Sequence, residues 1–165
     1  MMLLALLSCE EKPRKPIENL TKSEMKSSME KANRYLLNEE EEDIDNYVRR
    51  HGLTMVSTGT GLRYQIMKHG SERQVEKGDK VVLEYELHSI AGDLIYSSQN
   101  EGPKVFVVGD GSVESGLDEA MGYLHYGDVA KLIIPFHLGY GLHGDDRGIP
   151  EYATLVYTIK IIDNQ

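Results

Sequence analysis

The chain has 165 residues, of which 40% are hydrophobic and 27% are charged, and its formal net charge at pH 7 is −9. This length gives room for one domain of ordinary size and an appendage. The acidic balance argues against nucleic acid as a partner, because nucleic acids select basic surfaces. The single cysteine excludes an intrachain disulfide.

That cysteine, Cys9, follows a short apolar run. The run is too short to span a bilayer and is typical of the end of a secretory signal peptide. Leu6-Leu7-Ser8-Cys9 resembles a bacterial lipobox, in which the cysteine is acylated after cleavage. We therefore expect a signal-peptide remnant with a lipobox over 1–8, lipidation at Cys9 and anchorage to a membrane of the bacterial cell envelope. The alternative is an uncleaved apolar N-terminus with an incidental thiol. Residues 9–20 contain two prolines and predict a tether.

Residues 21–57 are predicted to be mainly helical. Thr21 and Glu24 have the spacing of a capping box at the start of a helix, and Gly52 predicts its end. Apolar residues recur at three- and four-residue steps, at Met25, Met29, Ala32, Leu36, Ile44, Tyr47 and Val48. We expect the acidic run at 39–43 to interrupt or fray the helix. The segment is either a solvated stalk or a dimerisation helix that makes a homodimer, and its few large aliphatic residues favour the stalk.

Residues 58–165 are predicted to form one domain. Alternating apolar and β-branched residues predict strands at 62–67, 81–88, 94–97, 105–108, 129–134 and 153–162. The only helix expected inside the domain is capped by Ser115, with Asp118 at its third position. One helix against an antiparallel sheet indicates an α+β fold.

A long glycine-rich loop, residues 136–152, joins the last two predicted strands. Loops of this length in compact domains are usually functional or disordered. This loop carries Tyr140 between two glycines and Ile149 before a proline, so we expect it to be functional.

The sequence contains no obvious nucleophile for covalent catalysis. The sequence contains neither a G-x-S-x-G elbow nor a G-x-x-x-x-G-K-[ST] phosphate loop. The residues that could ligate a metal are His125, His137, His143, Asp145 and Asp146. Their spacing matches no ligand motif, so we interpret the histidines as exposed loop residues and predict no metal or other cofactor. A metal-linked sensor is the weakest of the functional alternatives.

An ordered set of short motifs runs through the second half of the chain. They are Gly78-Asp79, Tyr85, Ile95-Tyr96-Ser97-Ser98, Gly102-Pro103, Val108-Gly109, Val113, Gly116, Gly127, Ala130-Lys131-Leu132, Gly139-Tyr140-Gly141, Ile149-Pro150 and Ala153-Thr154-Leu155-Val156-Tyr157. In order and spacing, the segment from about residue 76 to 163 resembles the FKBP-type peptidyl-prolyl cis–trans isomerases. With the lipobox and the helical segment, the whole plan resembles the gliding-motility-associated FKBP-type lipoproteins of Bacteroidetes. The resemblance implies a twisted antiparallel β-sheet wrapped around one short helix.

The resemblance also implies an activity, namely isomerisation of X–Pro bonds in proline-containing segments of exported proteins, which assists their folding. Rotation about a peptide bond is slow because amide resonance must be broken, with a barrier of ~18–20 kcal/mol. An apolar pocket can favour the twisted amide by desolvation, so no nucleophile is required. The alternative is a catalytically weak or inactive FKBP-like binding or chaperone module in an envelope secretion or motility complex.

Particular residues follow from the resemblance. It implies catalytic contacts at Tyr85, Tyr140 and Tyr157, with the Tyr140 hydroxyl and the backbone N–H of Ile149 as donors. It implies substrate binding by Ile95, Tyr96, Val113, Glu114, Leu117 and Ile149. The sequence departs from the family pattern where Tyr96 replaces an Asp, Leu117 replaces a Trp at the pocket floor, Lys104 and Glu114 replace a Phe and an Ile at the rim, and Glu151 replaces a Pro. The changes at Tyr96 and Leu117 favour the binding-module alternative.

Overall fold

A computed structural model describes residues 21–71 and 73–162. The predicted signal-peptide remnant at 1–8, the lipidation site Cys9 and the tether at 9–20 lie outside the described residues. The chain divides into two units between Asn38 and Glu39. Within the described ranges, none of the helices combines the length and the apolar character that crossing a membrane would require.

Helix α1 (Lys22–Arg50) has the predicted start and end. At its start, the backbone N–H of Thr21 donates to Glu24 Oε2 over 2.9 Å, and the N–H of Glu24 donates to Thr21 Oγ1 over 3.2 Å. This reciprocal pair confirms the capping box. At its end, Gly52 has a φ of +60° and donates its N–H to the Arg49 carbonyl, while Leu53 donates to the Val48 carbonyl. This is a Schellman motif, which requires the left-handed conformation that glycine adopts readily.

The acidic run does not interrupt α1, which corrects the prediction that residues 39–43 break or fray the helix. The reason is that several of these carboxylates have partners. Arg63, whose side chain is only 11% exposed, pairs with Glu41 and with Asp45, the latter over 2.5 Å. Glu40 accepts hydrogen bonds from Phe136 and Thr154. Like-charge repulsion along the helix is therefore offset by contacts with the rest of the second unit.

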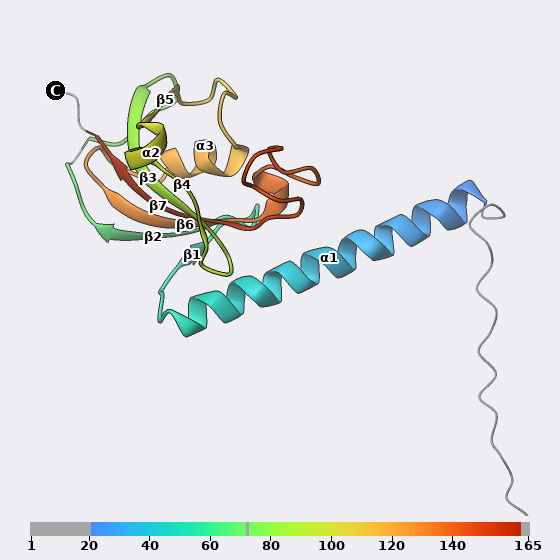
Figure 1. Ribbon diagram of the computed structural model, residues 1–165. Coiled ribbons are helices and arrows are strands. Elements are labelled where there is room, and N and C mark those ends of the chain that lie inside the picture. Colours follow the sequence, from blue (N-terminus) through green and yellow to red (C-terminus); the bar gives the residue numbers. More distant parts are fainter. Residues whose placement is uncertain (1–20, 72, 163–165) are drawn as a thin grey trace, which may run out of the picture. The chain divides into compact units, whose positions relative to one another are not determined.

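The second unit is built on one antiparallel sheet, which confirms the α+β prediction. The strands are β1 (Val56–Ser57), β2 (Arg63–Lys68), β3 (Lys80–Ser89), β4 (Leu94–Ser97), β5 (Lys104–Val107), β6 (Val129–Ile134) and β7 (Leu155–Ile161). Their order is β1-β2-β6-β7-β3-β4, and β5 also pairs with β3. Figure 1 shows the sheet curving around helix α3 (Ser115–Met121).

Helix α3 packs closely against the inner face of the sheet. Leu117, Ala120 and Met121 are fully buried. Gly116 permits this approach, since a Cβ atom there would lie 2.5 Å from Ile134 Cγ2. Ser115 is the first helical residue rather than the cap, which corrects the capping prediction. Its hydroxyl instead donates to the Leu138 carbonyl over 3.2 Å.

Two further short helices lie in the described part of the second unit, so the prediction of a single helix was incomplete. They are α2 (Ser98–Glu101) and the 3-10 helix η2 (Phe136–Leu138). Both are shorter than two turns, and such short elements produce no hydrophobic periodicity that a sequence pattern could reveal.

The outer face of the sheet carries a second apolar cluster at one end. Ile44 and Tyr47 of α1 pack there on Ile133 of β6 and Val156 of β7. Alternation along β7 placed Val156 opposite the core face, yet it is 1% exposed because α1 covers it. The compact unit therefore begins at Glu39, before the predicted domain start at residue 58.

Candidate active site

Three tyrosines lie in or against the core cluster of the second unit. Tyr85 comes from β3 and Tyr157 from the neighbouring strand β7, and their ring centroids are 6.0 Å apart. Tyr157 is fully buried and Tyr85 is 8% exposed. Tyr140, from the 136–152 loop, packs against the same cluster. The structure therefore brings together the three residues that were predicted to be catalytic.

Five of the predicted substrate-binding residues belong to the same core cluster or pack against it. Leu117 and Ile149 are members of the core cluster, and Ile95, Tyr96 and Val113 pack against it. Leu117 is fully buried. It therefore lies in the interior of the core.

Glu114 brings a negative charge into this apolar site. Its side chain is 2% exposed, so it is buried rather than at the rim as predicted. The Tyr157 hydroxyl donates to Glu114 Oε1. Lys104 Nζ lies 3.4 Å from both carboxylate oxygens of Glu114. A buried charge requires such partners, because an unpaired one is strongly destabilising.

The Lys104 ammonium also lies over the tyrosine rings. Its nitrogen is 5.5 Å from the Tyr85 centroid and 5.9 Å from the Tyr157 centroid, within the range of cation–π attraction. The side chain of Lys104 therefore takes up space above the tyrosines.

The tyrosine hydroxyls are kept protonated by their surroundings. Burial, followed by the negative charge of Glu114, raises the pKa of Tyr140 and of Tyr157 well above the usual value. Burial also raises the pKa of Tyr85. At neutral pH these groups can donate hydrogen bonds but cannot act as general bases.

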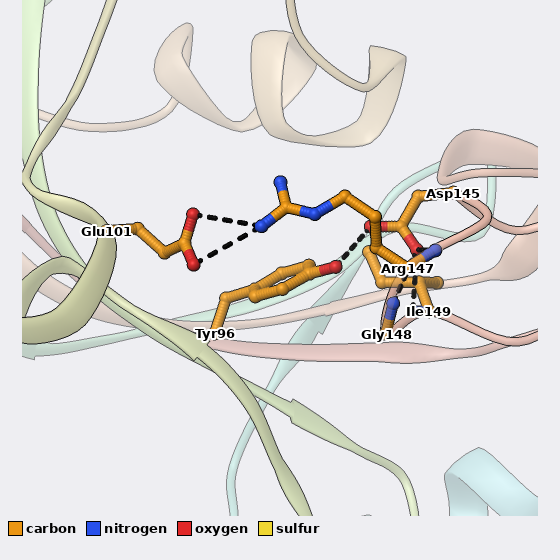
Figure 2. A network of polar contacts seen from close by, with 6 residues as sticks. All are labelled: Tyr96, Glu101, Asp145, Arg147, Gly148 and Ile149. Carbon is orange, nitrogen blue, oxygen red and sulfur yellow. Dashed lines mark hydrogen bonds and ion pairs between the residues drawn. The ribbon is translucent and has the colours of Figure 1, made fainter.

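Asp145 ties the tip of the 136–152 loop to strand β4 (Figure 2). Its Oδ2 accepts a hydrogen bond from the Tyr96 hydroxyl over 2.6 Å. Its Oδ1 accepts the backbone N–H groups of Arg147, Gly148 and Ile149 over 3.0, 2.9 and 2.7 Å. Burial alone would raise the pKa of Asp145, but these hydrogen bonds outweigh it and lower the pKa to about 2.

The Asp145 contacts include Ile149, a residue with an expected role in substrate binding. Its backbone N–H was predicted to donate to the substrate, whereas it donates to Asp145. The side chain of Ile149 is 3% exposed and remains part of the core cluster.

Arg147 forms a second link from the same loop (Figure 2). Its guanidinium group lies 5.2 Å from the Tyr96 ring centroid. It also pairs with Glu101 of α2 over 3.3 Å. Tyr96, which stands where the family pattern has an Asp, is thus enclosed by the loop and α2. The loop itself supplies the carboxylate that Tyr96 lacks.

The two ends of the 136–152 loop are held by one carboxylate of α1. Glu40 Oε1 accepts the backbone N–H of Phe136 over 2.7 Å and the hydroxyl of Thr154 over 2.6 Å. These donors flank the loop that carries Tyr140. Glu40 was not among the predicted site residues. It is 96 residues from Phe136 in the chain, and no local pattern indicates that contact.

The histidines and aspartates considered as metal ligands do not converge in the part of the chain that the structure describes. No group of three or more His, Cys, Asp or Glu residues there could hold a metal ion. His137 bonds the Thr60 carbonyl over 3.0 Å. Asp145 has the backbone and Tyr96 partners described above.

A groove of about 530 Å3 lies mainly on the outer face of the sheet. Its lining includes Val82, Glu84 and Glu86 of β3, Thr158 and Lys160 of β7, and Pro103. On β3 these residues alternate with the buried Leu83 and Tyr85. Most of its lining therefore belongs to the face of the sheet opposite the tyrosine rings, although Tyr85 also borders the groove.

An antiparallel sheet that curves around a short helix, with tyrosines in and against the core between them, defines a class of small α+β domains. Comparison with known families identifies the particular family. Residues 71–162 match the family described as FKBP-type peptidyl-prolyl cis-trans isomerase. The chain belongs to this family of isomerases.

Named relatives and solved structures agree with this assignment. The chain is 36% identical over 107 residues to the probable FKBP-type peptidyl-prolyl cis-trans isomerase FkpA of Neisseria meningitidis serogroup B, a match that covers 64% of this chain and 39% of that protein. It thus spans less than half the length of that relative. It is 31% identical over 103 residues to the FK506-binding protein of the same organism, covering 62% of this chain and 94% of that protein. The crystal structure of FkpA from Escherichia coli superposes with a TM-score of 0.64 at 26% identity, covering 88% of this chain and 73% of that one.

Proposed function

We propose that this chain catalyses cis–trans isomerisation of X–Pro bonds at the tyrosine cluster. The proline ring packs against apolar residues of the same cluster, Ile95 and Leu117, and the Tyr140 hydroxyl donates to the amide carbonyl. A planar amide is polar through resonance, and a twisted one has lost most of that charge separation. Burial in this site therefore favours the twisted amide over the planar amide.

One observation carries the proposal: three tyrosines, each with a raised pKa, lie in or against one apolar core cluster that includes Leu117. A protonated, half-buried Tyr140 is a donor for a carbonyl oxygen. Its acidity is too weak for proton transfer, and rotation about an amide requires none.

A conservative substitution of Tyr140 tests the proposal. Tyr140→Phe removes the hydroxyl and keeps the ring, so we expect kcat/KM for X–Pro peptides to fall roughly tenfold, the effect of about one hydrogen bond, while Tm stays unchanged. Tyr152→Phe is the matched control, because Tyr152 lies in the same loop and is 43% exposed. Equal losses of activity in both variants would contradict the assigned role. A fall in the Tm of Tyr140→Phe that accounts for its loss of activity would also contradict it.

A second candidate is a binding or chaperone module that holds proline-containing segments and isomerises them poorly or not at all. The burial of Glu114 with Lys104 beside the tyrosines favours it, because an ion pair makes the site less apolar than a twisted amide prefers. Folded protein that binds proline peptides without accelerating their exchange would support this candidate over the first.

The cellular setting follows from the sequence motif. The lipobox-like residues that end at Cys9 support anchorage to the bacterial envelope, where the domain would assist the folding of exported proteins. The first part of α1 then serves as a stalk. Its exposed Met25 and Met29 are compatible with the alternative role of a homodimer contact.

A further inference from the structure

The environment of Lys104 has the chemistry of a cation-binding site. The ammonium faces a buried carboxylate, Glu114, at 3.4 Å and two aromatic rings, Tyr85 and Tyr157, at 5.5 and 5.9 Å. A carboxylate combined with aromatic faces attracts ammonium and guanidinium groups. Cations are held best where the site is shielded from water, and the Glu114 side chain is 2% exposed.

The two partners of this ion pair differ in mobility. Glu114 lies at the start of α3, is buried, and is fixed by the Tyr157 hydroxyl. Lys104 is the first residue of β5, and its side chain is 24% exposed. Its ammonium group is joined to the backbone through four flexible methylene groups. The carboxylate is therefore fixed, whereas the ammonium can move out to solvent.

A ligand that reaches the tyrosine rings must displace Lys104. The displacement would leave Glu114 buried with only the Tyr157 hydroxyl, and a buried charge without a counterion is unfavourable. A ligand that brings its own cation restores the pair, whereas a neutral ligand does not. An acidic ligand adds repulsion with Glu114.

We propose that Glu114, Tyr85 and Tyr157 form a cation subsite, which Lys104 fills in the free protein and which a lysine or arginine beside the proline fills in the bound polypeptide. This inference rests on the proposed function, since it places the substrate at the tyrosine cluster. It defines the substrate class as X–Pro segments with a basic residue next to the proline.

Peptide binding to the full chain tests the subsite. Three peptides that differ only in the residue before proline, which is lysine, norleucine or glutamate, are compared by titration calorimetry, and a second set varies the residue after proline. We expect the wild type to bind the lysine peptide more tightly than the norleucine peptide in at least one set. In Lys104→Met this preference should rise to about tenfold, the range of a desolvated cation–π and ion-pair contact. In Glu114→Gln it should disappear.

Controls separate the subsite from other effects. Lys80→Met removes an exposed lysine near the start of β3, and we expect it to keep the wild-type preference. Lys104→Gln repeats the test if Lys104→Met does not fold by circular dichroism. A preference that is unchanged in Glu114→Gln, a preference for the glutamate peptide, or no measurable binding of any peptide would overturn the subsite.

The proposed function is measured separately on the same peptides by exchange spectroscopy in nuclear magnetic resonance, which needs no coupling protease. A lysine preference in binding without faster cis–trans exchange would contradict the isomerase and support the subsite. Faster cis–trans exchange that does not depend on Glu114 would support the isomerase and contradict the subsite.

Discussion

Removal of the Glu40 carboxylate should loosen the loop that carries Tyr140. In Glu40→Ala, the N–H of Phe136 and the hydroxyl of Thr154 lose an acceptor at 2.7 and 2.6 Å. Each unsatisfied donor costs about 1–3 kcal/mol. Partial hydration and the shared acceptor reduce the sum, so we expect the free energy of unfolding to fall by about 2–4 kcal/mol. Glu40→Gln keeps an acceptor oxygen and should lose less.

Urea unfolding followed by circular dichroism measures this loss, since the chain has no tryptophan for fluorescence. Glu42→Ala is the matched control, because Glu42 is an exposed acidic residue of the same helix. The two variants share any gain in helix propensity, so their difference reports the contacts of Glu40. We expect Glu42→Ala to change stability by less than about 0.5 kcal/mol. Equal midpoints in Glu40→Ala and Glu42→Ala would refute the clamp.

Three other predictions address the loop, the domain start and the anchor. The pKa of Asp145 is lowered from 3.8 to about 2 in the folded state, so its contribution to stability is present above pH 3.8 and is lost as the pH falls towards 2. In an acid titration of stability, Asp145→Asn should lack this part of the loss. An acid profile identical to that of the wild type would contradict the prediction. Ile44→Ala should lower the free energy of unfolding by about 2–5 kcal/mol. Met29→Ala, at a position 62% exposed, should change it by less than about 0.5 kcal/mol. Similar changes in the free energy of unfolding for the two variants would mean that α1 does not belong to the domain. Cys9→Ser should release the protein from the membrane fraction of cells, and its retention there would argue against lipidation.

Local patterns predicted the strands well. The run Val129–Ile134 is β6 as expected, and Leu94–Ser97 is β4. These segments are rich in apolar, β-branched and aromatic residues, a signal that depends only on neighbours in sequence. The cap of α1 at Thr21 is likewise a local contact.

Contacts between distant residues account for what the sequence did not predict. The burial of Val156 requires Ile44, which is far away along the chain. The partners of Glu40 and Asp145 depend on how α1 and the loop dock. Lys104 and Glu114 were recognised as departures from a family pattern, but their mutual pairing and the burial of Glu114 appear only in three dimensions.

The most direct test of the central claim is the rate at which the folded full chain accelerates cis–trans exchange of an X–Pro peptide. The barrier to this rotation is ~18–20 kcal/mol, so the uncatalysed reaction takes tens to hundreds of seconds and any real catalysis is easily resolved. We predict acceleration that is proportional to enzyme concentration and reduced in Tyr140→Phe. Folded protein that produces no acceleration at any concentration would contradict the assignment of isomerase activity to this chain.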